Sequence, residues 1–489
     1  MPPTDLLRWP LVGTLLRWRH VRTAAQLVLL VVALAIVLHG LFGRQLAATN
    51  LATVLAWIHY RGLLIGALLL AGNLFCAACP MILVRDAARR VHAPSRRWPR
   101  RLGKWVALAL FAAVLFAYEL FDIWALPAAT AWIVVGYFAA ALLIDLTFTG
   151  ASFCKHVCPV GQFNFIASTL SPLEVRVRDR DVCRSCTTVD CIKGRRERRT
   201  ADKPEAATSG ERAPLVVIQR GCELALFLPS KVGNLDCTFC LDCVHACPHD
   251  NAAIGFRVPG DELADDRRRS AIGRLSRRPD LAALALLFTF AALLNAFAMT
   301  APVYTVERAL AGWLGTESEA LVLGLLFAAG LAVVPVALGA AAAAATRGLT
   351  PGSGPSVRST AVRFAFALVP FGAGVWLAHY GVHFLTGAGA IVPVSQSAAI
   401  EATGRALLGE PDWRGMGLRS GAVFPFQLGA VLVGALGSSA LVHRIAGRDF
   451  PSRAGRAAAP WILLVLALTA IALWIIGQPM EMRGTELGG

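Results

Sequence analysis

Long apolar runs are the feature that most constrains how this chain can fold. The sequence has 489 residues, of which 56% are hydrophobic and only 16% are charged, and its mean hydropathy is +0.58. Apolar stretches of about 20 residues recur along it, which is the length that an α-helix needs to cross a bilayer. A soluble chain of this size would rarely be so apolar. We therefore expect a mainly α, polytopic helical membrane protein embedded in a lipid bilayer.

The apolar runs predict about nine spans in two blocks. Four lie at 23–42, 61–83, 105–122 and 127–149, and five lie at 281–303, 320–345, 361–385, 421–443 and 459–477. They define an N-terminal membrane region, residues 1–149, and a C-terminal membrane region, residues 279–489. Residues 150–278 lie between them as the only long polar region. Within it, residues 192–214 are poor in apolar side chains and predict a flexible insert.

Basic residues indicate the orientation of the chain in the membrane. The net charge is +16, and Lys and Arg concentrate in residues 1–22, 85–104, 346–360 and 444–458. The positive-inside rule places these segments, and with them the polar region, in the cytoplasm. An odd number of spans then leaves the C-terminus in the periplasm. The same distribution explains the charge by orientation alone, so we expect no nucleic-acid partner.

The polar region contains a ferredoxin motif. Its cysteines follow the spacing C-x2-C-x2-C-x3-C-P over residues 237–248, which is the bacterial run that holds a [4Fe–4S] cluster. A zinc site typically pairs one C-x2-C with a distant second pair, so zinc is disfavoured. Upstream, residues 183–191 form a stretched first half, C-x2-C-x4-C, and a further cysteine follows the insert. The usual crossover of two-cluster ferredoxins then assigns one cluster to Cys183, Cys186, Cys191 and Cys247, and the other to Cys222, Cys237, Cys240 and Cys243.

The sequence thus predicts an inserted cytoplasmic, ferredoxin-like α+β domain with two [4Fe–4S] clusters. The other four of the twelve cysteines form two pairs, Cys76/Cys79 and Cys154/Cys158, each followed by proline. They end the second and fourth predicted spans, at the inner boundary of the membrane. Three interpretations stay open for these thiols: a third [4Fe–4S] cluster, a redox-active dithiol pair, or a structural or assembly role.

Histidines form a second constellation at the opposite side. Four of the ten histidines, His39, His59, His379 and His383, fall at the outer ends of predicted spans. A quinol site or the ligation of haem b would use such residues, since imidazole can accept a proton and bind iron. The alternative is interfacial histidines satisfied by headgroups or water. Arg61, Asp145 and Asn295 are further polar residues in the predicted spans, and for Asp145 the alternative is pairing with an inner-loop arginine.

The segment C-K-H-V-C-P-V-G-Q-F-N at 154–164, followed by the two ferredoxin halves, resembles membrane-bound 4Fe–4S polyferredoxins of the NapH/NosR type. The resemblance covers about residues 60–255 and includes the complete ferredoxin run. Cys154 and Cys158 match the family's C-x3-C-P element, whereas the pair at Cys76 and Cys79 is one residue shorter. The resemblance implies an iron–sulfur protein of the bacterial inner membrane. Such proteins move electrons between the quinone pool and a reductase, or support that reductase's maturation.

We therefore expect an electron-transfer subunit of an oxidoreductase system rather than a stand-alone enzyme. Its clusters would exchange electrons with a soluble or membrane redox partner protein and with the quinone pool. No nucleophile elbow, Walker loop or dinucleotide fingerprint occurs in the sequence, so no catalytic residue is assigned. The alternative function is a redox-sensing or maturation factor for a partner reductase.

Overall fold

The computed structural model describes residues 5–198, 215–352 and 354–481. Residues 199–214 of the predicted flexible insert lie outside this part of the chain, whereas residues 192–198 end a short helix and form a strand. The helices of the N-terminal membrane region are α1 (Pro10–Arg17), α2 (Val21–Phe42), α3 (Leu51–Thr53), α4 (Arg61–Ala71), α5 (Leu74–Ala77), α6 (Pro80–Ala88), α7 (Trp105–Leu120) and α8 (Pro127–Thr147).

The middle of the chain is where the described strands occur. Its helices are α9 (Pro159–Ala167), α10 (Arg180–Ser185), α11 (Asp190–Lys193), α12 (Asp242–Ala246) and α13 (Asp261–Ala264), and its strands are β1 (Leu173–Val177), β2 (Arg195–Arg198), β3 (Leu215–Gln219) and β4 (Ala252–Phe256). β1 pairs with β4 and β2 pairs with β3, both antiparallel. These small two-stranded sheets have the α+β character predicted for residues 150–278.

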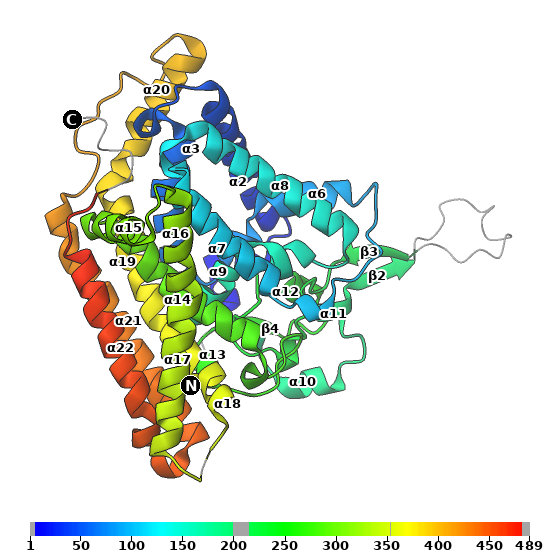
Figure 1. Cartoon of the computed structure of the whole chain (residues 1–489). Coiled ribbons are helices and arrows are strands. Elements are labelled where there is room, and N and C mark those ends of the chain that lie inside the picture. The colour runs from blue at the N-terminus through cyan, green and yellow to red at the C-terminus, as the bar shows by residue number, and fades with distance from the viewer. Residues whose placement is uncertain (1–4, 199–214, 353, 482–489) are drawn as a thin grey trace, which may run out of the picture.

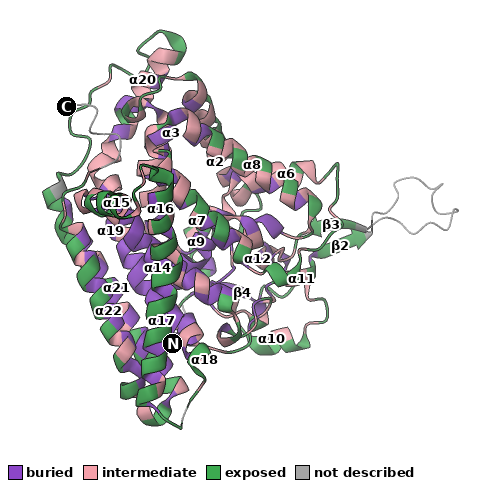
Figure 2. Cartoon of the chain, in the orientation of Figure 1, coloured by how far each residue is buried: buried purple, intermediate pink, exposed green. Residues whose placement is uncertain are grey.

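In the C-terminal membrane region, the described residues form helices joined by turns and loops. Its helices are α14 (Pro279–Phe297), α15 (Ala301–Leu314), α16 (Glu319–Ala328), α17 (Val334–Leu349), α18 (Val357–Ala365), α19 (Val369–Gly387), α20 (Ile391–Thr403), α21 (Ser420–Asp449) and α22 (Ala454–Ile476). Figure 1 shows α14, α17, α19, α21 and α22 gathered on one side of the molecule, with α2, α6 and α8 on the other and the strands below them. α14 and α19 form the centre, since most of their length is buried (Figure 2).

Eight stretches of helix in the described residues are long and apolar enough to cross a membrane. The ninth predicted span is α7, which is apolar but has only 16 residues. At 1.5 Å per residue it extends about 24 Å, less than the roughly 30 Å hydrocarbon core. A helical membrane protein is therefore confirmed, with eight full-length candidates and one short apolar helix.

The second span begins and ends earlier than the sequence suggested. We predicted helix at 61–83, but the continuous helical stretch is Leu51–Ala71, and a turn at Gly72 ends it. Gly72 has φ +80°, a left-handed conformation that glycine adopts without strain. Two short helices, α5 and α6, then carry the first cysteine pair and the residues after it. The apolar run was wrongly extended because α5 and the first turns of α6 are themselves rich in apolar side chains.

Residues 150–278 do not pack as a body separate from the helices. Leu224, Leu235 and Leu263 belong to the same hydrophobic core as α14 and α19. A second, smaller core lies around Val175 and Ile254 of the β1–β4 sheet, and the N-terminal segment covers it with Leu6 and Leu7. The cysteine-bearing loops are consequently held between a sheet on one side and the helix bundle on the other.

Candidate functional site

The twelve cysteines gather into three groups of four. We name them the surface group (Cys183, Cys186, Cys191, Cys247), the middle group (Cys222, Cys237, Cys240, Cys243) and the bundle group (Cys76, Cys79, Cys154, Cys158). The first two are the sets that the ferredoxin crossover predicts. Among the described residues, no three His, Cys, Asp or Glu side chains converge on one position suited to a single metal ion.

The surface group is held together by Asn251. Its backbone N–H donates to the Cys247 sulfur at 3.3 Å, and its Nδ2 donates to the Cys183 sulfur at 3.2 Å. Burial, together with the nearby sulfurs of Cys247, Cys183 and Cys186, raises the pKa of Cys191 to about 11. Hydrogen bonds from the Val189 and Thr188 region lower the pKa of the more exposed Cys186. The fourth cysteine of the downstream motif thus lies with the three of the upstream motif.

The middle group lines one cavity. Cys222, Cys237, Cys240 and Cys243 all face it, together with apolar side chains such as Leu224. Because its polar donors are four thiols and its remaining wall is largely apolar, the residues present fit a [4Fe–4S] cluster. Cys222 was the ligand with the weakest support from the motif, and it lines this cavity with the other three.

The bundle group lies among the helices. Its Cys158 sulfur is an electrostatic neighbour of Tyr137, which lies halfway along α8. The reason is that α9, which begins directly after Cys158, is buried among the helices over almost its whole length. Cys76 and Cys79 lie within electrostatic range of the same sulfur. The two pairs therefore form one group, in which Cys76 is buried and Cys79, Cys154 and Cys158 are half-buried.

Local geometry around the second pair explains how this group forms. Cys154 lies in a π-helical turn, Phe153–Val157, and Pro159 starts α9 directly after Cys158. Proline at the first helical position leaves the next backbone N–H groups free, and Gly161 N–H donates to the Cys158 sulfur at 3.1 Å. Wider turns of this kind are frequent at functional sites.

Direct contacts join the three groups in order. The Cys222 N–H donates to the Cys191 carbonyl at 3.0 Å, which links the middle group to the surface group. Asn73 links the middle group to the bundle group, because its Nδ2 donates to the Cys237 carbonyl at 3.1 Å and its Oδ1 accepts from the Cys76 N–H at 3.4 Å. The groups thus form a series from the solvent-facing strands into the helix bundle.

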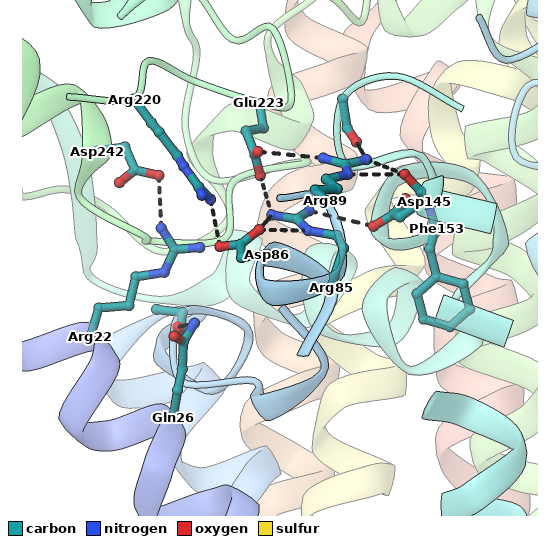
Figure 3. A network of polar contacts seen from close by, with 12 residues as sticks. Arg22, Gln26, Arg85, Asp86, Arg89, Asp145, Phe153, Arg220, Glu223 and Asp242 are labelled. Atoms are coloured by element: carbon teal, nitrogen blue, oxygen red, sulfur yellow. Dashed lines mark hydrogen bonds and ion pairs between the residues drawn. The ribbon is translucent and has the colours of Figure 1, made fainter. Parts of the chain in front are cut away.

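A buried network of charges holds the cysteine loops against the helices (Figure 3). Its centre is Arg85 of α6, which is 1% exposed and pairs with Asp86 and Glu223 at 2.7 Å and with Asp145 at 3.4 Å. Arg89 donates to the Asp145 carbonyl at 2.6 Å. Glu223 follows directly after a cysteine of the middle group, so the network joins that loop to α6 and α8. The alternative stated for Asp145, pairing with an arginine, is confirmed.

Two further ion pairs fix the same loops. Arg22, at the start of α2, pairs with Asp242 at 2.8 Å, between two cysteines of the middle group (Figure 3). Lys104 pairs with Asp236 at 2.6 Å, and both are buried. Burial raises the pKa of Asp236, but the Lys104 ammonium outweighs it and holds that pKa below its ordinary value. Each pair connects a helix to the residue next to a cysteine.

The four predicted histidines do not form one site. His39 accepts from the Leu51 N–H at 3.0 Å and lies 3.4 Å from Glu401. Both ring nitrogens of His59 lie within 3.1 Å of backbone carbonyl oxygens. The rings of His379 and His383 lie 5.0 Å apart, and the buried Nε2 of each has no hydrogen-bond partner among the described residues. The Nε2 of His39 has no hydrogen-bond partner there either, but it faces the Glu401 carboxylate, whereas no such acidic group is paired with His379 or His383 among the described residues.

Arg61 lies beside this histidine pair. Its guanidinium is 4.2 Å from the ring centre of Trp57 and donates to the Tyr118 hydroxyl at 3.2 Å. It is an electrostatic neighbour of both His379 and His383. A haem with two histidine ligands does not fit the pair, because residues four apart share one helix face and cannot approach an iron from opposite sides.

The sequence did not point to Asn73, Arg85 or Glu223 as functional residues. Asn73 belongs to no recognised motif, and Glu223 lies 138 residues along the chain from its partner Arg85. Asn164 was quoted in the family motif without a role, and its Nδ2 donates to the Cys76 sulfur at 3.3 Å. Its position six residues after Cys158 was the only signal in the sequence that could have indicated this contact.

Comparisons with known proteins show the same resemblance. The chain is 28% identical over 170 residues to the methylamine utilization ferredoxin-type protein MauN of Paracoccus denitrificans, covering 31% of this chain and 56% of that one. It is 26% identical over 203 residues to the ferredoxin-type protein NapH of Escherichia coli, covering 38% of this chain and 64% of that one. The matched segments therefore span less than two thirds of either relative. No protein-family model matches the sequence, and no solved structure matches it.

Proposed function

Starting from a chain that is NapH-like and of the ferredoxin type, we propose an iron–sulfur electron-transfer protein of the bacterial inner membrane with three [4Fe–4S] clusters. The surface, middle and bundle groups each hold one. The observation that carries the proposal is that the twelve cysteines form three groups of four. Hydrogen bonds connect the surface group to the middle group and the middle group to the bundle group. Of the three interpretations left open for Cys76, Cys79, Cys154 and Cys158, the proposal adopts the third cluster.

Bound clusters supply one-electron steps along this series. The chain's own residues position the sulfurs, exclude water from the bundle group, and hold the cysteine loops against the helices through Arg85 and Lys104. The proposed orientation keeps residues 150–278 in the cytoplasm, where the surface group meets a soluble or membrane redox partner. The basic loops at 85–104, 346–360 and 444–458 support that orientation.

The proposed exchange partner within the membrane is the quinone pool. The free Nε2 atoms of His379 and His383 provide places to hold a proton as electrons leave a quinol. Arg61 and the Tyr118 hydroxyl add a fixed charge and a hydrogen-bond donor beside them. His39 and His59 are left out of the proposed site, because their ring nitrogens contact other groups of the chain.

The iron content of purified protein tests the cluster number. The double variant Cys154→Ala, Cys158→Ala is expected to lose one third of the iron and acid-labile sulfide, about four iron atoms per chain. Cys183→Ala with Cys186→Ala is the matched control, and it should remove the same amount from a different cluster. Unchanged iron in the first double variant would rule out a cluster at the bundle group.

A further inference from the structure

The Cys76 sulfur of the bundle group receives a side-chain hydrogen bond from the amide of Asn164. The distance from Nδ2 to the sulfur is 3.3 Å, and Asn164 is 0% exposed. The Asn164 Oδ1 has no partner among the described residues. Turning the amide around would place an oxygen against a thiolate, which only accepts hydrogen bonds, so the donor orientation is the one compatible with a ligand sulfur.

Asn164 is fixed in this position by its own helix. It lies in α9, whose first turn is organised around the preceding cysteine pair: Gly161 N–H donates to Cys158, and Gln162 donates to the Cys154 carbonyl at 3.0 Å. Gln162 is also 0% exposed. One short helix therefore positions a donor against the second cysteine pair and a donor against the first, which comes from a different part of the chain.

We propose that Asn164 is a positioning residue that raises the reduction potential of the cluster in the bundle group. The inference rests on the proposed function, since it requires a cluster at these four cysteines. Reduction adds negative charge to a cluster, and a hydrogen bond to a ligand sulfur stabilises the more negative state. The effect is large in a buried site, because little water competes for the sulfur and the local dielectric constant is low.

The surface group offers a matched comparison. Asn251 donates to Cys183 through the same atom, Nδ2, at 3.2 Å. Asn164 contacts a sulfur of the bundle group, whereas Asn251 contacts a sulfur of the surface group, so each would affect a different cluster. A variant at each asparagine therefore removes the same type of bond from two different clusters of one protein, and each serves as the control for the other.

The test is a redox titration of the purified full-length protein, followed by electron paramagnetic resonance. The bundle-group signal is identified as the one missing from the Cys154→Ala, Cys158→Ala variant. Asn164→Leu is expected to lower the midpoint potential of that signal by at least about 59 mV. For a one-electron step, this shift is a tenfold change in the equilibrium constant for reduction. The other signals should stay in place. Asn251→Leu should move the surface-group signal and leave the bundle-group signal unchanged.

The outcomes separate this inference from the proposed function. If the wild-type protein contains only enough iron for two [4Fe–4S] clusters, the proposed cluster at the bundle group is contradicted. Three clusters with an unchanged potential in Asn164→Leu overturn the role of Asn164 alone. If Asn164→Leu does not assemble its iron, Asn164→Ala removes the donor without adding bulk and gives the same measurement. Asn164→Gln keeps an amide donor and is expected to recover part of the shift.

Discussion

At the scale of single residues, Arg85 shows why a buried charge here is structural. Its guanidinium contacts the carboxylates of Asp86, Asp145 and Glu223, so no charge in this network is left alone. Burial raises the pKa of Asp86, but Arg85 and Arg220 outweigh it and hold that pKa below its ordinary value of 3.8. Such a network adds little stability relative to apolar packing, yet breaking it is costly, because it strands buried charges.

Arg85→Met is accordingly expected to destabilise the protein by about 3–5 kcal/mol, since it leaves buried carboxylates without their cation. Arg220→Met is the matched control: its side chain is 45% exposed and shares the partner Asp86, so the expected cost is at most about 1 kcal/mol. Unfolding of the two variants in detergent measures the difference. Equal losses of stability would contradict a special role for Arg85.

At the scale of elements, the turn after α4 determines where the first cysteine pair lies. Gly72 adopts φ +80°, and a Cβ atom at this position would lie 2.6 Å from the Phe239 ring. The next residue, Asn73, bonds to both the Cys237 and Cys76 backbones. A helix that ended one turn later would carry Cys76 away from the other thiols. The turn therefore joins the middle group to the bundle group.

Gly72→Ala is expected to separate this turn from Phe239 and reduce the iron bound by the bundle group. Both the left-handed φ and the close ring contact oppose a side chain there. Gly66→Ala, in the same helix, is the control, because a Cβ there meets nothing within 4 Å and alanine favours helix by roughly 1 kcal/mol. Iron analysis and thermal unfolding of both variants provide the measurement. Full iron in Gly72→Ala would contradict this role of the turn.

At the scale of the whole molecule, the described helices connect two candidate redox regions. The bundle group lies beside α9, and Phe163 of α9 packs against Trp376, whose ring in turn lies 4.8 Å from that of Tyr380. Tyr380 neighbours His379, with ring centres 5.4 Å apart. A run of aromatic rings therefore extends from α9 to the histidine pair.

A quinol analogue added to membranes is expected to reduce the [4Fe–4S] clusters of the wild-type protein. His379→Gln should slow this reduction at least tenfold, because it removes a buried proton-accepting nitrogen. His39→Gln is the control, since His39 is paired with Glu401 and is expected to have little effect. Visible absorbance of the clusters follows the reaction. Intact clusters that the analogue leaves oxidised would contradict the quinone link.

The sequence by itself determined the membrane character, the positions of most of the long apolar helices, the ferredoxin spacing and the resemblance to NapH-type proteins. These properties depend on local composition and on spacing along the chain, which a linear pattern records directly. It also predicted both crossover sets, because Cys247 and Cys222 follow a rule of the motif.

Only the tertiary structure decided which distant residues meet. Asn164 and Cys76 are 88 positions apart, and Arg85 and Glu223 are 138 apart. The apolar run at 61–83 gave no sign of the break at Gly72, because the short helices after it begin with apolar residues as well. The place of the bundle group among the helices likewise follows from the burial of α9 between other helices. Contacts of this kind depend on how helices pack against one another. The hydrophobic periodicity of one helix shows which face is buried, but it does not identify the residues that pack against that face.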